Sequence, residues 1–245
     1  MTKRVSWIVF WAVFVSLAVA GLWLAPAAKA EAKKRTADDA LTPAIKDPHR
    51  HEQFLARIKQ GPVGLLFLGD SITDAWPGRG KESWAKFAPY QPADFGISGD
   101  RTEHVLWRIT HGELEGINPK VVVIMIGTNN IGHFRDEQPE WAAAGVKKIV
   151  QTVRQKLPQA KVLLLGVFPR GPKDSDVRKK VEAINQIICK LDDGKQIRYL
   201  DIGTVFLDAN GEIPKEIMPD SLHPTAKGYD LWYEAMRPLL EEMMK

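Results

Sequence analysis

The chain has 245 residues, of which 44% are hydrophobic and 26% are charged, and it carries a formal net charge of +4 at pH 7. This is the composition of an ordinary globular protein, and the length fits one domain with a sizeable core. Lys3, Arg4 and Lys29 lie in a leader without acids, so the rest of the chain is nearly neutral, which argues against a nucleic-acid partner. The single cysteine, Cys189, excludes an intrachain disulfide and a cysteine metal cluster.

The leader combines Lys3 and Arg4 with an apolar run from about Trp7 to Ala25 and the small-x-small pattern Ala28-Lys29-Ala30. This pattern predicts a signal peptide over residues 1–30. The alternative is an uncleaved anchor that tethers the protein to a membrane through residues 7–25, because the run approaches the roughly 20 residues that span a bilayer. In either case we expect the rest of the chain to be exported, as a periplasmic or secreted protein.

Residues 31–46 are polar and rich in Ala and Lys, which predicts a linker, and residues 47–245 are expected to form the domain. Asp47 and Pro48 are typical of a helix start. Uninterrupted apolar runs predict five strands, over residues 63–68, 93–97, 121–126, 161–167 and 197–202. Apolar residues at helical spacing predict helices over residues 102–111, 142–157, 177–191 and from about 225 onward. The alternation of predicted strands and helices along the chain predicts a parallel sheet with helices on both faces.

Polar and glycine-rich segments follow the predicted strands, where the ligand site of a parallel α/β sheet lies. We expect these segments to meet at one edge of the sheet. They are Gly69-Asp70-Ser71, Ser98-Gly99-Asp100, Gly127-Thr128-Asn129-Asn130 and Phe168-Pro169-Arg170-Gly171, together with a loop before the last helix that holds Asp220 and His223.

These residue types match acyl-transfer chemistry. A serine hydroxyl needs a base to become a nucleophile, and Ser71 follows a strand at a predicted helix start, whose positive end favours an oxyanion. His223 can act as the base, with Asp220 orienting its ring. The Ser71 N–H, the Gly99 N–H and the Asn129 amide are candidate donors to the oxyanion.

The segments GDSIT, GISGD, GTNN and DSLHP resemble the four sequence blocks of the SGNH (GDSL-type) hydrolase superfamily. With the residues between them they cover about residues 60–235. The segments DFGISGDRTEHVLWRI and VVVIMIGTNN are especially similar to the branch that includes the catalytic subunits of platelet-activating factor acetylhydrolase IB.

This resemblance implies a flavodoxin-like three-layer α/β/α sandwich with a five-stranded sheet, and ester hydrolysis without a metal or a cofactor. It implies a catalytic triad of Ser71, Asp220 and His223, and an oxyanion hole formed by Ser71, Gly99 and Asn129. Many members of the superfamily carry Asp after the oxyanion-hole asparagine, whereas this chain has Asn130.

The predicted function is that of an exported serine esterase acting on short acyl esters, chiefly acetyl esters, of a carbohydrate or a lipid-like alcohol. Asp70, Trp76, Asn130 and His133 are expected to line the substrate pocket, and Asp70 to accept backbone N–H bonds around Ser71. Loops 77–92 and 168–176 are expected to set specificity. The alternatives are a non-catalytic binding module on the same fold, or a lysophospholipase or thioesterase. The sequence carries no signal for an oligomeric state.

Overall fold

The computed structural model describes residues 34–245. The predicted leader lies outside the described residues, so its cleavage or anchoring stays a prediction. Within the described part of the chain, no helix is both long enough and apolar enough to span a bilayer.

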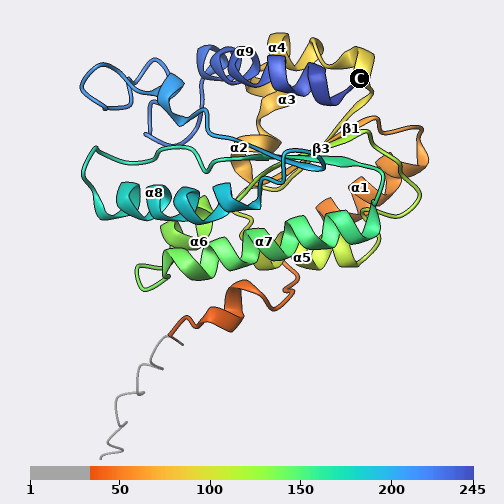
Figure 1. The fold of residues 1–245 in the computed structure, drawn as a ribbon, viewed down its shortest axis with the longest axis horizontal. Helices are drawn as coiled ribbons and strands as arrows, with labels where there is room; N and C mark the ends of the chain where they lie inside the picture. Colours follow the sequence, from red (N-terminus) through yellow and green to blue (C-terminus); the bar gives the residue numbers. More distant parts are fainter. Residues whose placement is uncertain (1–33) are drawn as a thin grey trace, which may run out of the picture. The chain divides into compact units, whose positions relative to one another are not determined.

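A five-stranded parallel sheet with the order β2-β1-β3-β4-β5 forms the centre of the fold (Figure 1). All five predicted strands are present, and the predicted parallel sheet is confirmed. After β1 the chain adds β2 on one side and β3 on the other, so the direction of strand addition reverses next to β1. Ligand crevices of such sheets lie at this reversal, outside the carboxyl ends of the strands. The strands are β1 (Leu65–Gly69), β2 (Pro92–Gly96), β3 (Val121–Met125), β4 (Lys161–Leu165) and β5 (Ile197–Leu200).

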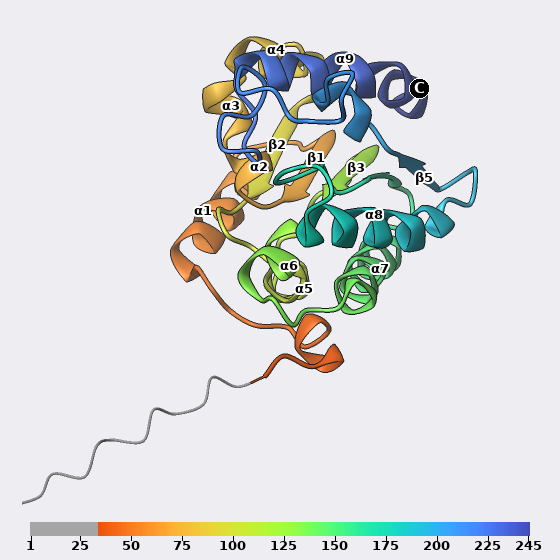
Figure 2. The ribbon, with the colours of Figure 1, turned by 90° about the vertical axis from the view of Figure 1, so that its left-hand side faces the viewer.

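Helices cover both faces of the sheet, which confirms the predicted three layers (Figures 1 and 2). One face packs against α1 (Pro48–Lys59), α5 (Thr102–Thr110), α7 (Pro139–Lys156) and α8 (Asp176–Ile188). The other packs against α3 (Trp76–Arg79), α4 (Lys81–Ala85) and α9 (Ala226–Met243). The short helices α2 (Ser71–Asp74) and α6 (Thr128–His133) begin just after β1 and β3. Four 3₁₀ turns complete the described elements, at Ala37–Ala40, Ala88–Tyr90, Cys189–Leu191 and Gly203–Phe206.

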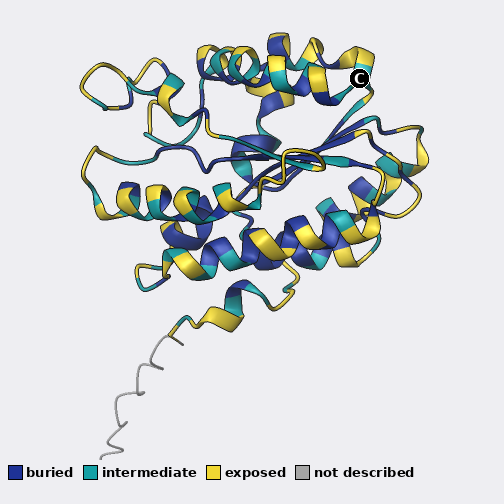
Figure 3. Cartoon of the chain, in the orientation of Figure 1, coloured by how far each residue is buried: buried dark blue, intermediate teal, exposed yellow. Residues whose placement is uncertain are grey.

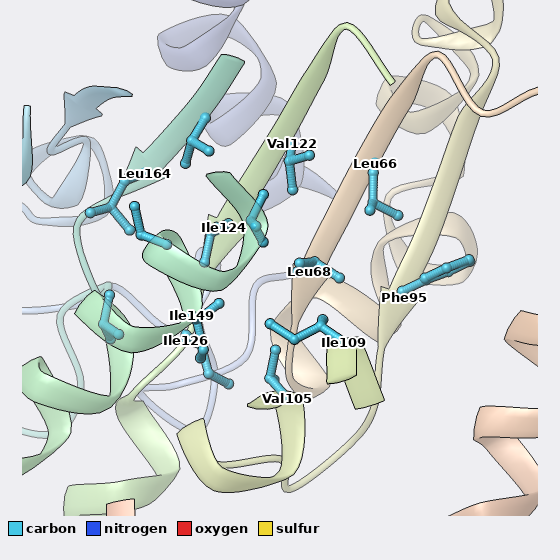
Figure 4. Packing of buried hydrophobic residues seen from close by; sticks show 14 of the residues in the cluster. Leu66, Leu68, Phe95, Val105, Ile109, Val122, Ile124, Ile126, Ile149 and Leu164 are labelled. Atoms are coloured by element: carbon cyan, nitrogen blue, oxygen red, sulfur yellow. The ribbon is translucent and has the colours of Figure 1, made fainter. Parts of the chain in front are cut away.

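The central strands are buried along their whole length (Figure 3). Alternate side chains of these strands pack on opposite faces of the sheet. Leu66, Leu68 and Ile124 belong to the cluster beneath α5 and α7, which Figure 4 shows with Val105 and Ile149. The neighbouring odd-numbered strand residues pack toward α9. Burial on both faces explains why these strands read as continuous apolar runs.

Trp76 lies in an aromatic cluster beneath α9, with its ring centroid 4.0 Å from that of Trp232 and 5.4 Å from that of Tyr229. Its side chain is completely buried, and its ring N–H donates to Ser83 Oγ at 3.1 Å. The prediction that Trp76 lines the substrate pocket is therefore wrong. The residue belongs to the core, because the short α3 turns its first side chain inward against α9.

Residues 34–46, predicted as part of a linker, are packed on the domain, and the compact unit extends from Lys34 to Lys245. The backbone carbonyl of Ala40 accepts from Thr102 Oγ1 at 3.0 Å. A Cβ on Gly145 of α7 would lie 2.9 Å from that carbonyl oxygen, so the glycine makes room for the segment. Arg35 forms ion pairs with Glu103 at 2.9 Å and Glu137 at 2.8 Å. The domain therefore begins before residue 47.

Arg35→Ala is expected to lower the free energy of unfolding by about 3 kcal/mol, because removing one partner leaves a buried carboxylate without its cation. The side chains of Glu137 and Glu103 are 0% and 2% exposed. Chemical denaturation of the variant and of Lys34→Ala, at the exposed neighbouring position, provides the measurement. Equal effects of the two substitutions would show that residues 34–46 do not stabilise the domain.

Candidate active site

Ser71 is the first residue of α2, and Asp70 alone separates it from the end of β1. The Asp70 side chain caps this helix by accepting the backbone N–H of Ile72 at 3.0 Å, as expected from the sequence. A Cβ on Gly69 would lie 2.0 Å from Thr73 Oγ1 and 2.9 Å from the carbonyl oxygen of Met125. The glycine is thus needed because no side chain fits between β1, β3 and the helix that presents Ser71.

A continuous chain of hydrogen bonds joins Ser71, His223 and Asp220. Ser71 Oγ lies 2.9 Å from His223 Nε2, and His223 Nδ1 lies 2.6 Å from Asp220 Oδ2. The tautomer that donates its Nδ1–H to Asp220 leaves Nε2 to accept the serine hydroxyl. The structure therefore brings together the three residues that the sequence predicts as nucleophile, base and orienting acid.

Asp220 is held ionised by its hydrogen bonds. Burial raises the pKa of its carboxyl group, but donation from the His223 ring, from the His223 backbone N–H and from the Leu222 N–H outweighs this and lowers the pKa below its usual value. An ionised carboxylate next to Nδ1 stabilises the imidazolium that forms when His223 takes a proton.

Besides the Ser71 N–H, the predicted oxyanion donors lie in the segments after β2 and β3. Gly99 has a φ of +75°, a left-handed conformation that glycine adopts without a steric penalty. Asn129, in the first turn of α6, donates from Nδ2 to the carbonyl oxygen of Asp100 at 2.9 Å, which ties the two loops together. An amide nitrogen carries two hydrogens, so Asn129 keeps one for a further acceptor.

Lys46 also contacts the Gly99 loop, although sequence reasoning assigned it to a linker. Its Nζ donates to the carbonyl oxygen of Ser98 at 2.5 Å and lies 3.6 Å from Asp100 Oδ1. It also lies 3.6 Å from the position that a Cβ on Gly99 would take. A lysine in a polar segment carries no sequence signal of such a contact, which arises only when residues 34–46 fold back on the domain.

Asn130 is completely buried and does not line a pocket, so that prediction is wrong. Its Oδ1 accepts the Thr102 N–H at 3.0 Å, and its Nδ2 lies 3.3 Å from carboxylate oxygens of Glu103 and of Glu137. An amide can donate to these two acids, whereas an aspartate would add a third negative charge among them. These contacts favour asparagine over aspartate at position 130.

Asp70 and His133 differ in exposure. Asp70 is completely buried, so it supports the Ser71 loop from the interior of the domain. It does not line a pocket, contrary to the prediction. His133 is exposed, and its Cε1 lies 3.9 Å from the position that a Cβ on Gly99 would occupy. Of the four predicted pocket residues, His133 is thus the one that reaches the surface beside the Gly99 loop.

The arrangement provides an activated hydroxyl and a base, with a carboxylate that orients the base, at the carboxyl edge of the sheet. These are the parts that nucleophilic acyl transfer requires. Across residues 34–245, no group of three His, Cys, Asp or Glu side chains is placed to hold a metal ion.

Residues 67–231 match the family model described as the GDSL-like lipase/acylhydrolase family. The chain is 36% identical over 196 residues to platelet-activating factor acetylhydrolase IB subunit alpha1 of Bos taurus, covering 79% of this chain and 82% of the relative. It is 36% identical over 198 residues to subunit alpha2 of Rattus norvegicus, covering 80% and 84%.

Two solved structures share the fold. A GDSL-like lipase from Bacteroides thetaiotaomicron superposes with a TM-score of 0.65 at 18% identity, covering 78% of this chain and 97% of that chain. A mutant of an acetyl-xylooligosaccharide esterase from Geobacillus superposes with a TM-score of 0.59 at 19% identity, covering 71% and 92%.

Asp70→Asn tests the protonation state of the acid next to Ser71. Burial raises the pKa of Asp70 to about 7, with the nearby Asp100 adding to this effect and the Ile72 N–H and Arg170 opposing it. The folded protein therefore keeps a proton that the unfolded chain releases near pH 4, so the Asp70 carboxyl destabilises the fold as the pH rises from about 4 to about 7. The asparagine variant lacks this dependence and keeps the acceptor for Ile72.

The measurement is the free energy of unfolding of the wild type minus that of Asp70→Asn, followed from pH 4 to pH 9. This difference should decrease up to about pH 7 and then stay level. A difference that increases with pH over this range would mean that the carboxylate is stabilised in the folded state.

Proposed function

The chain belongs to the GDSL-like lipase/acylhydrolase family, and we propose that it is an exported serine esterase that removes short acyl groups, above all acetyl, from a carbohydrate or lipid-like alcohol. The observation that carries the proposal is the hydrogen-bond chain from Ser71 Oγ through His223 to Asp220, with separations of 2.9 Å and 2.6 Å.

In the proposed first step, His223 Nε2 takes the hydroxyl proton of Ser71 as Oγ attacks the carbonyl carbon of the ester. The carbonyl electron pair moves to oxygen, and the Ser71 N–H, the Gly99 N–H and the Asn129 amide donate to the oxyanion. When the intermediate collapses, the bond to the alcohol breaks and His223 gives its proton to the leaving alkoxide. Asp220 stabilises the imidazolium between these two transfers.

In the second step a water molecule replaces the alcohol. His223 takes a proton from the water as its oxygen attacks the acyl carbon bound to Ser71, and the same donors hold the second oxyanion. Collapse breaks the bond between Ser71 Oγ and the acyl group, and His223 returns the proton to the serine. The products are the free acid and the unmodified enzyme.

Two observations support a short acyl group. The relatives at 36% identity are named acetylhydrolases. Among the described residues, Ile45 is the only large hydrophobic side chain that is mostly exposed, at 55%. Binding a long acyl chain out of contact with water would require a larger exposed apolar surface than Ile45 provides. Export is proposed from the sequence of residues 1–30, with its basic start, apolar run and small-x-small ending.

Ser71→Ala is expected to reduce kcat for 4-nitrophenyl acetate by about 10⁴-fold or more, because the nucleophile is lost while the oxyanion donors remain. A fluorophosphonate probe should label the wild type at Ser71 and leave the variant unlabelled. Ser98→Ala, an exposed serine in a neighbouring loop, is the matched control and should keep both properties. Full activity of Ser71→Ala would refute the proposed mechanism, and an unlabelled, inactive wild type would favour a binding module.

Asn129→Ala is expected to lower kcat by about 10²- to 10³-fold with little change in KM, as the loss of one oxyanion donor does in other hydrolases. Because Asn129 also donates to Asp100, the unfolding free energy of the variant must be measured alongside. Asn129→Asp keeps the size but removes the donor, and should be equally impaired. A kcat within about twofold of the wild type in a folded Asn129→Ala protein would remove this residue from the oxyanion hole.

A further inference from the structure

The Arg170 loop contacts two of the segments that carry the proposed catalytic groups. It follows β4, and its Nη1 donates to the carbonyl oxygen of Thr128 at 2.9 Å and to Thr128 Oγ1 at 3.1 Å. The next residue, Gly171, donates its N–H to the carbonyl oxygen of Ser221 at 2.9 Å. Thr128 precedes Asn129, and Ser221 lies between Asp220 and His223 in the chain. The Arg170 loop is therefore joined to both sides of the candidate active site.

Gly132 provides the space that the Arg170 guanidinium occupies. A Cβ on Gly132 would lie 2.1 Å from Nη1, 2.8 Å from Cζ and 2.9 Å from Nη2. The guanidinium group therefore lies against the Cα of Gly132, where any other residue would carry a side chain. This close fit fixes the position of the guanidinium beside α6, unlike that of a freely moving surface arginine.

Among residues 34–245, no acidic side chain forms an ion pair with Arg170. Within this part of the chain, the guanidinium forms its hydrogen bonds through Nη1, and both go to the neutral residue Thr128. Burial lowers the pKa of the guanidinium, while the more distant Asp70 and Asp220 oppose this change. Nε and Nη2 thus retain N–H groups to donate. Two neighbouring N–H groups on one side of a guanidinium can bind two oxygens of a carboxylate or phosphate in a bidentate manner.

A basic cavity extends from Arg170 between α6 and α8. It has a volume of about 640 Å³, and its lining includes Arg135, Lys179 and Lys180 as well as Arg170, against one acid, Asp176. Lys180 Nζ donates to the backbone carbonyl oxygens of Arg135 and Glu137, so its charge is also directed at neutral groups. A cavity with this excess of positive charge attracts anions and disfavours cations.

We propose that Arg170 is the centre of an anion subsite, and that the natural substrate is an ester that also carries a carboxylate or phosphate group close to the scissile bond. The anion would bind to Nε and Nη2 of Arg170 and extend into the basic cavity, while the ester carbonyl lies at Ser71. The proposal rests on the proposed function and narrows its substrate to negatively charged esters. Arg135 and Lys179, which also line the cavity, attract the anionic group of the substrate from a greater distance.

The test compares three acetate esters of similar size. Phenyl acetate is neutral, 3-acetoxybenzoate carries a carboxylate, and 3-acetoxyphenyl phosphate carries a phosphate. Values of kcat/KM are measured for the wild type, Arg170→Gln, Arg170→Lys and Gly132→Ala, with Lys190→Gln as an exposed control outside the cavity. Arg170→Gln removes the positive charge. Arg170→Lys keeps the charge but lacks the planar guanidinium that can bind two oxygens at once. Gly132→Ala displaces the guanidinium without changing any charge.

Arg170→Gln should lower kcat/KM for the anionic esters about tenfold more than for phenyl acetate, mainly through KM, as the loss of one charged hydrogen-bonding group predicts. Arg170→Lys and Gly132→Ala should show smaller losses in the same direction, and Lys190→Gln should match the wild type. Added NaCl should reduce the preference of the wild type for anionic esters. Whichever of the two anionic esters is more sensitive to Arg170→Gln identifies the group that the subsite binds.

Equal losses on the neutral and anionic esters would overturn the proposal and assign Arg170 to the support of the Thr128–Asn129 turn. No preference for anionic esters in the wild type would also overturn it. Calorimetric titration with phenyl phosphate gives a readout that needs no turnover, and binding should be lost in Arg170→Gln and kept in Ser71→Ala. Hydrolysis that survives in Ser71→Ala would refute the proposed function, while this titration would still decide the anion subsite.

Discussion

The buried ion pair between Arg108 and Asp100 is the interaction on which the geometry of the site depends. Arg108 Nε and Nη2 lie 3.0 Å and 2.9 Å from the same Asp100 oxygen, and Nη2 also donates to the carbonyl oxygen of Phe95. The side chains are 3% and 0% exposed. This pair ties the Gly99 loop to α5 and to β2. Because Asn129 donates to the Asp100 carbonyl oxygen, the position of the second proposed oxyanion donor depends on the same residue.

The two faces of the sheet support the site by different means. On the α5 face, the polar network continues from Arg108 Nη1 to Glu113 at 2.5 Å and from Glu113 to His51 of α1 at 3.0 Å. On the α9 face, the core is aromatic, and Tyr229 donates its hydroxyl to the carbonyl oxygen of Ile72 at 2.7 Å. The Ser71 helix is thus held by α9, and the Gly99 loop by α5 and α1. Such support from packed elements keeps reacting groups in a fixed geometry.

The sequence predicted the sheet and the position of the site because buried parallel strands read as apolar runs, and their carboxyl ends share one edge. Ser71 and Asn129 were found in this way. Asn130 was misplaced because successive residues of a helix point about 100° apart, so the neighbour of a residue that faces the site can face the core. Trp76 was misplaced for the same reason. The role of Arg35 was missed because its partners lie 68 and 102 residues away in the sequence, and local sequence patterns cannot predict contacts over such separations.

Three cations, Arg101, Arg170 and Lys46, act on His133 at the edge of the site. Burial lowers the pKa of the His133 ring, and the three cations lower it further, while Glu103 opposes them. The cations therefore act together on one position beside Gly99. Solvent screens the more exposed Lys46, whereas the half-buried guanidinium of Arg170, which has no ion-pair partner in the described part of the chain, is screened less. Cations at this edge favour the oxyanion proposed at Ser71, and they equally favour a substrate that brings its own negative charge. Both effects follow from the same charges, which is why Arg170 bears on the choice of substrate as well as on the chemistry.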